Sequence, residues 1–141
     1  MAVVVVKPHT YMNLSGVALR PLLDEPDFEP ARDLLVLVDD AAIPLGTFRI
    51  RARGSAGGHN GLKSVEATLR SREYPRLRVG VGPVPDEVED LADFVLAPFA
   101  TDEWARLDPL WPVMVDAVEC WLRDGTDAAM QRFNHPTGEP Q

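Results

Sequence analysis

The stretch TFRIRARGSAGGHNGLKSVEATLRS, residues 47–71, passes from a strand pattern through a glycine loop into a helix pattern. Apolar residues alternate with arginines over 47–53, which predicts a half-exposed strand with a basic outer face. Apolar residues then recur at helical spacing over 62–69. The loop between them is rich in glycine, which lets a backbone adopt unusual angles or approach a neighbour closely. The stretch therefore predicts a strand, a loop and a helix in succession.

Similar patterns flank this stretch on both sides. Continuous apolar runs predict buried strands at 3–7 and 34–40. An alternating run predicts a strand at 76–82, and residues 93–99 are predicted to be a short strand or an extended segment. Helical spacing predicts helices at 16–23, 101–123 and 126–134. Proline cannot donate a helical hydrogen bond, so the second of these helices should break near Pro109 and Pro112. Strands and helices interleave, which predicts an α/β single domain over residues 1–141, with a mixed, mostly parallel sheet and helices on both faces.

Charge is unevenly distributed along the 141 residues, whose net charge is −8. Residues 41–82 hold eight basic and two acidic side chains, giving +6, whereas residues 83–127 hold two basic and twelve acidic ones, giving −10. The basic segment 49–78 either faces an anionic partner or pairs with the acidic segments inside the fold. The single cysteine, Cys120, excludes a disulfide framework. No apolar run approaches the length of a membrane helix, and we expect a cytoplasmic protein.

Polar residues near the ends of the predicted strands are candidates for chemistry. Asp39 ends the strand at 34–40, where it could orient a histidine or simply cap a turn. Asn13 could hold a carbonyl oxygen or serve as a turn residue. The glycine loop before Asn60 could bind an anion through its N–H groups or be a plain turn. The three histidines lack metal-ligand spacing, and each could be purely structural.

Several motifs together resemble one family. They are KPHTYMNLSG (7–16), LVLVDDAAIPLG (35–46), GSAGGHNGLKS (54–64), RLRVGVG (76–82), DFVLAPF (93–99) and DGTDAAMQRFN (124–134). In order and spacing they are similar to the motifs of bacterial peptidyl-tRNA hydrolase, and the similarity covers nearly the whole chain. The resemblance implies a metal-free and cofactor-free cytoplasmic hydrolase. Such an enzyme cleaves the ester between a peptide and the 3′ end of tRNA.

The resemblance also implies roles for individual residues. Asn13 and Asn60 match substrate-binding asparagines, and Tyr11 matches the aromatic residue beside the first of them. Asp39 matches the aspartate that keeps the catalytic histidine basic. His59 would be a structural neighbour of Asn60. The basic segment 49–78 would face the tRNA.

The family normally begins with several dozen further residues, which carry a first strand and the catalytic histidine. Residues 1–141 begin near the strand that precedes the first motif, so we expect an N-terminally shortened domain whose activity is slow or absent. A non-catalytic module that binds tRNA or a partner is one alternative. A repurposed esterase that uses His9 or His59 as its base is another. A missing strand would leave an open sheet edge, through which we expect a homodimer.

Overall fold

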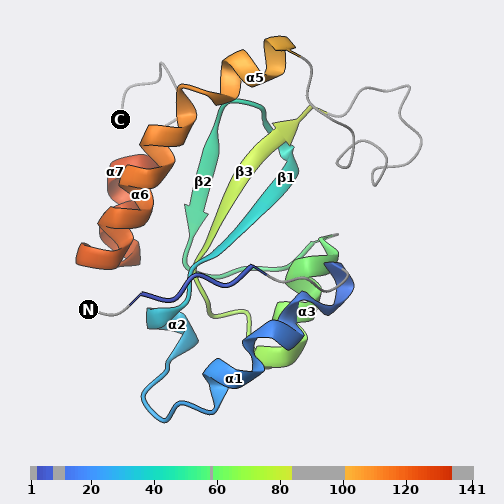
Figure 1. Ribbon diagram of the computed structural model, residues 1–141, viewed down its shortest axis with the longest axis vertical. Helices are drawn as coiled ribbons and strands as arrows, with labels where there is room; N and C mark the ends of the chain where they lie inside the picture. The colour runs from blue at the N-terminus through green and yellow to red at the C-terminus, as the bar shows by residue number, and fades with distance from the viewer. Residues whose placement is uncertain (1–2, 8–11, 58, 84–100, 135–141) are drawn as a thin grey trace. The chain divides into compact units, whose positions relative to one another are not determined.

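The computed structural model describes residues 3–7, 12–57, 59–83 and 101–134 (Figure 1). The chain forms two compact units. Residues 1–34 and 53–74 make the first, and residues 35–52 and 75–141 make the second.

The first unit is helical in its described part. A 3₁₀ helix, η1 (Met12–Leu19), runs into a single α-helical turn, α1 (Arg20–Leu23). A second short turn, α2 (Pro30–Asp33), and a longer helix, α3 (Asn60–Leu69), complete the unit. The buried face of α3 carries Gly61, Leu62 and Val65, because these positions recur at helical spacing. Tyr74 is fully buried in the same unit, and its hydroxyl lies 3.5 Å from the Leu62 carbonyl oxygen.

The packing of η1 against α3 depends on a glycine. Gly16 N–H donates to Ser64 Oγ at 2.8 Å, and Gly16 is itself buried. A Cβ atom at this position would overlap the Ser64 carbonyl oxygen and Thr68 Oγ1. Only glycine therefore allows the two backbones to come this close.

The second unit contains a mixed three-stranded sheet with the order β1–β3–β2. The strands are β1 (Val36–Pro44), β2 (Phe48–Arg51) and β3 (Arg76–Gly82). β1 pairs with β3 in parallel, with Val36 opposite Arg76, and β2 pairs with β3 antiparallel. The α/β class with a mixed sheet is thus confirmed, while helices on a second sheet face stay a prediction.

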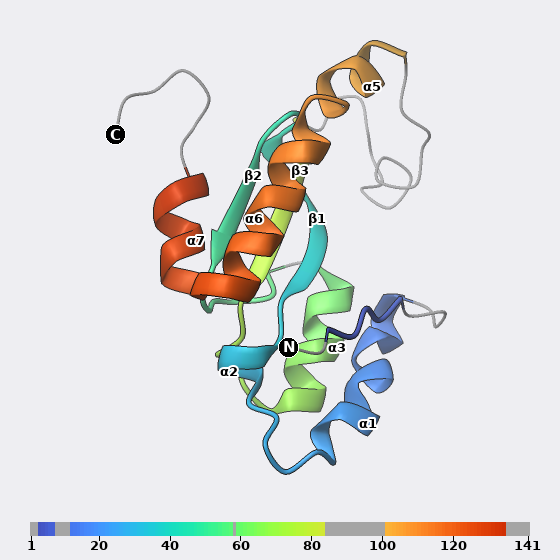
Figure 2. The same cartoon turned by 60° about the vertical axis from the view of Figure 1, so that its left-hand side comes forward.

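Three helices follow the sheet in this unit: α5 (Thr101–Leu107), α6 (Leu110–Asp124) and α7 (Thr126–Phe133). Figure 2 shows α6 and α7 side by side over the sheet. The shared core consists of apolar side chains from β2, β3 and these two helices, namely Phe48, Ile50, Leu77, Met114, Ala117, Cys120 and Ala129. The predicted break is confirmed, because α5 ends before Pro109 and α6 begins after it.

Two predicted strands differ from the structure. Residues 3–7 form no strand, and Val4 and Val5 are 71% and 82% exposed, so the prediction of a buried strand there was wrong. Composition favours a strand, but a strand needs a hydrogen-bonded neighbour, and the described residues provide none for this segment. The predicted end of the second strand at Asp40 was also wrong, because β1 continues through an irregularity until Pro44 pairs with Gly82.

The remaining predictions about segments have mixed outcomes. The strand prediction for 93–99 lies outside the described residues. The alternation over 47–53 is confirmed, because Phe48 and Ile50 are buried while Arg49 and Arg51 are exposed. In the described residues, no helix has the length and apolar character needed to cross a membrane.

Candidate functional site

The glycine loop leads into α3 through a histidine cap. Gly54 and Gly57 have φ angles of 146° and 58°, which an L side chain rarely adopts. His59 then precedes α3, and its Nδ1 accepts a hydrogen bond from the Leu62 N–H at 3.2 Å. That bond satisfies one of the N–H groups left without a partner at the start of a helix. His59 therefore has a structural role at the start of α3, and its use as a base stays a prediction.

Asn60 and the first motif meet in the pairing of η1 with α3. Asn60 is the first residue of α3 and is exposed, and Asn13 is the second residue of η1. Figures 1 and 2 show the two elements side by side and running in the same direction. Gly16 and Ser64, each the fifth residue of its element, are hydrogen-bonded. The backbones of both asparagines therefore lie at the same end of the pair. The Asn13 side chain, Tyr11 and His9 lie outside the described residues.

Asp39 lies within β1, in the second unit. It is half-buried and opposite Val79 in the parallel ladder. Successive side chains of a strand point to opposite faces, so Asp39 and Asp40 face opposite sides of the sheet. The catalytic role that the resemblance implies for Asp39 stays a prediction.

The neighbouring Asp40 is held by two partners. Its Oδ1 accepts from the Ala42 N–H at 2.9 Å, and its Oδ2 lies 3.2 Å from Arg78 Nη1. Arg49 and Arg51 join these residues in lining a hollow of about 270 Å³ on the second unit. Part of the basic segment thus pairs within the fold, while Arg49 and Arg51 remain exposed.

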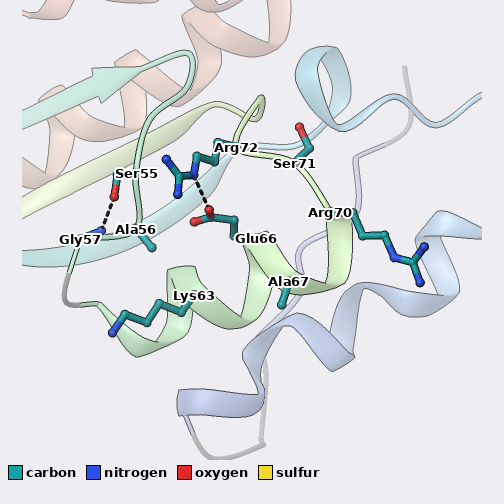
Figure 3. A pocket seen from close by; sticks show the side chains of 9 residues that line it. All are labelled: Ser55, Ala56, Gly57, Lys63, Glu66, Ala67, Arg70, Ser71 and Arg72. Carbon is teal, nitrogen blue, oxygen red and sulfur yellow. Dashed lines mark hydrogen bonds and ion pairs between the residues drawn. The ribbon is translucent and has the colours of Figure 1, made fainter.

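Figure 3 shows a second hollow, of about 560 Å³, which lies wholly in the first unit. The loop from Ser55 to Gly57 forms one wall and α3 forms the other. An ion pair between Arg72 Nε and Glu66 Oε1, 2.5 Å apart, lies in it. Among the residues that the structure describes, no group of three or more His, Cys, Asp or Glu side chains is placed to hold a metal ion.

The sequence model of the peptidyl-tRNA hydrolase family matches residues 1–141. The chain belongs to this family. A peptidyl-tRNA hydrolase from Gemmatimonas aurantiaca is 55% identical over 127 residues, which are 89% of this chain and 67% of that relative. The Chloroflexus aurantiacus peptidyl-tRNA hydrolase is 51% identical over 132 residues, or 94% of this chain and 70% of its own length.

Solved peptidyl-tRNA hydrolases have the same fold. A complex with N-propanol is 26% identical and has a TM-score of 0.81, covering 94% of this chain and 66% of that one. The Acinetobacter baumannii peptidyl-tRNA hydrolase is 27% identical with a TM-score of 0.78, covering 89% and 62%. The chain thus spans about two thirds of the length of these family members.

One residue of the last peptidyl-tRNA hydrolase motif, Asn134, has a structural role that no pattern in the sequence predicted. Asn134 Oδ1 accepts from the Ile50 N–H, and Asn134 Nδ2 donates to the Ile50 carbonyl oxygen, both at 2.7 Å. The amide thereby caps the outer edge of β2, an edge strand. Its position just after a predicted helix was visible in the sequence, but the 84-residue separation from Ile50 was not predictable from any local pattern.

Proposed function

We propose that residues 1–141 carry the substrate-binding elements and the orienting carboxylate of a peptidyl-tRNA hydrolase. The reaction would cleave the ester between a peptide and the 3′ end of tRNA, in the cytoplasm, and would release tRNA for reuse. The family match over residues 1–141 is the observation that carries this proposal. The shared end of η1 and α3, where two asparagines of family motifs lie, supports it.

Ester hydrolysis requires a base that activates water, a group that orients the base, and donors for the developing oxyanion. Asn13 and Asn60 would bind the substrate and donate to its carbonyl oxygens, and Tyr11 would flank them. Asp39 would orient the catalytic histidine and stabilise its charged form.

The catalytic histidine itself would come from the part of the longer relatives that has no match in residues 1–141. About a third of the length of the two curated relatives is in this part. General base catalysis typically contributes about 10²–10⁴-fold to the rate. Residues 1–141 alone should therefore bind substrate but hydrolyse it slowly or not at all.

Two interactions complete the proposal. The basic segment 49–78 would attract the tRNA backbone, and that attraction would weaken with salt because it is electrostatic.

In the described sheet, β1 has a neighbour on one side only. A second copy of the chain would pair along this open edge, and sedimentation would then show a dimer; a stable monomer at high concentration would contradict it.

The test measures release of free tRNA from an N-acetylated aminoacyl-tRNA. Residues 1–141 are compared with the same residues preceded by the unmatched N-terminal portion of the Gemmatimonas aurantiaca relative. We expect activity only in the joined protein. Asp39→Asn should lower its rate by about 10²-fold or more, because the base loses its orienting charge. Asp116→Asn is the matched control, because Asp116 is an exposed acid on α6.

Two outcomes would contradict the proposal. If residues 1–141 alone were fully active and His9→Ala or His59→Ala abolished that activity, the esterase with an internal base would be correct instead. If the joined protein bound tRNA but never hydrolysed the ester, a non-catalytic binding module would be the better description.

A further inference from the structure

The solvent-exposed side of α3 is a single stripe of four residues. Asn60, Lys63, Ala67 and Arg70 are all exposed and are three, four and three positions apart. This spacing places them on one face of an α-helix and its C-terminal cap. We call these four residues the α3 stripe. One end holds the asparagine proposed to bind substrate, and the rest offers two cations with a small side chain between them.

The two cations of the stripe are Lys63 and Arg70. Within the described residues, neither Lys63 nor Arg70 forms an ion pair. The acid on α3 is Glu66, and it is already bound to Arg72. Figure 3 shows Glu66 turned towards Arg72, while the Lys63 and Arg70 side chains extend outward from different ends of the helix. The stripe thus presents two separate positive charges to solvent.

Arg70 occupies a position where glycine would be the better residue for stability. It is the C-cap of α3, with φ 53° and ψ 37° in the left-handed region. The left-handed conformation destabilises a residue with a Cβ atom by roughly 1–2 kcal/mol, whereas glycine adopts it without strain. The negative end of the helix dipole stabilises a cation at this position and offsets part of the strain. Replacing Arg70 with glycine should therefore remove the charge without destabilising the helix, so the variant tests the charge alone.

We propose that Lys63 and Arg70 contact two different phosphates of the tRNA strand that ends in the ester bound near Asn60. The inference rests on the proposed function and specifies which cations of segment 49–78 bind the tRNA. Their Cα atoms are about 10.5 Å apart along the helix axis, because seven residues each rise about 1.5 Å. Diverging side chains at this spacing suit an extended polyanion better than one small anion. Ala67 leaves the intervening surface open to the strand.

The experiment measures the Kd of residues 1–141 for uncharged tRNA over a range of salt concentrations. Lys63→Ala and Arg70→Gly should each weaken binding roughly fivefold at low salt. Each should also reduce the slope of log K against log salt by about 1, since one phosphate contact is lost. Lys63→Arg and Arg70→Lys should retain most of the affinity. Inorganic phosphate should not compete beyond its effect on ionic strength.

Arg123→Ala is the matched control, because Arg123 is an exposed arginine of α6 paired with Glu119. It should leave the Kd unchanged. Urea unfolding should show Arg70→Gly to be as stable as the unmodified chain or more so, which excludes misfolding as the cause of weaker binding. Equal affinities for Arg70→Gly, Lys63→Ala and Arg123→Ala would overturn the inference, as would undetectable binding of tRNA at low salt.

The same variants in the joined hydrolase separate this inference from the proposed function. Lys63→Ala and Arg70→Gly should raise KM and leave kcat nearly unchanged, because they remove contacts that are the same in the ground state and the transition state. If the joined protein is active and KM does not move, the stripe inference fails while the hydrolase proposal stands. If the joined protein is inactive but Lys63→Ala and Arg70→Gly weaken tRNA binding, the stripe inference stands and the hydrolase proposal fails.

Discussion

The Asn134 amide hydrogen-bonds the outer edge of β2, where the described sheet has no further strand. Edge strands carry backbone N–H and C=O groups that no neighbour satisfies. Here the Ile50 N–H and C=O are both bonded to the one side chain, at 2.7 Å each, and both bonds are partly buried. Asn134 lies just beyond α7, so the same contact attaches α7 to the sheet. Its loss should weaken the second unit.

Asn134→Ala should lower the free energy of unfolding by about 2 kcal/mol, since each of the two hydrogen bonds contributes about 1 kcal/mol net. Asn134→Asp keeps an acceptor for the Ile50 N–H but turns a carboxylate oxygen towards the Ile50 carbonyl. It should therefore be at least as destabilising at neutral pH. At acidic pH the difference in free energy of unfolding between this variant and the unmodified chain should shrink, because a protonated carboxyl can donate to the Ile50 carbonyl again. Urea unfolding measured from pH 7 to pH 4 gives these differences.

The control for this prediction is Gln131→Ala, which removes an exposed amide from α7 without touching β2. If Asn134→Ala were no less stable than Gln131→Ala, the two bonds would contribute nothing and the edge-capping argument would be wrong. A second readout is association. Asn134→Ala should sediment as larger species at high concentration than Gln131→Ala, since its exposed edge can pair with another chain.

Three other changes test the packing and the ion pairs. Gly16→Ala should destabilise the chain by about 1–3 kcal/mol, because the new methyl group overlaps the Ser64 carbonyl oxygen; unfolding equal to that of the unmodified chain would contradict the close approach. Asp40→Asn should cost about 1–2 kcal/mol in urea unfolding, because Arg78 loses its partner in a half-buried pair. The Arg32 side chain and then the Glu29 N–H lower the pKa of Asp33 to about 2. The stabilisation that Asp33 provides is full above about pH 4 and lost towards pH 2, so Asp33→Asn should cost less than about 1 kcal/mol at pH 7 and nothing near pH 2.

Local patterns predicted those elements whose signals are local. The alternating run at 76–82 has the bounds of β3, because a short apolar repeat flanked by a proline before it and another after it leaves little freedom. The separation of α5 from α6 follows from proline chemistry alone. The helix after the glycine loop begins at Asn60, directly after its N-cap His59. The sequence did not show that the His59 side chain would accept the capping hydrogen bond.

Predictions failed where a distant partner decides the structure. Four valines at 3–6 favour a strand, but β-propensity describes the fit to a half-buried pleated surface rather than a property of the backbone. The continuation of β1 beyond Asp40 depends on the pairing of Pro44 with Gly82, which lies 38 positions further along the chain. The predicted burial of this strand was also wrong at Leu37, which is 59% exposed.

The site was predicted from motifs, and the structure explains why two of them occur together. The first motif ends at Gly16 and the third at Ser64, and these two residues share a hydrogen bond within a contact that only glycine permits. His59 likewise belongs to the third motif and caps α3. Gly16 and Ser64 therefore maintain the η1–α3 pair, and His59 caps one of its helices.

This division limits what the motifs say about catalysis. A chain can keep Gly16 and Ser64 because they hold η1 against α3, and His59 because it caps α3, whether or not an ester is cleaved beside them. Asp39 is different, because it lies in the other unit and makes no part of that pairing. The role proposed for it requires a histidine to orient, whereas the binding proposed for Asn60 and the α3 stripe would require only the helix. Loss of activity in Asp39→Asn with tRNA affinity intact would therefore separate catalysis from recognition, which the motifs alone do not.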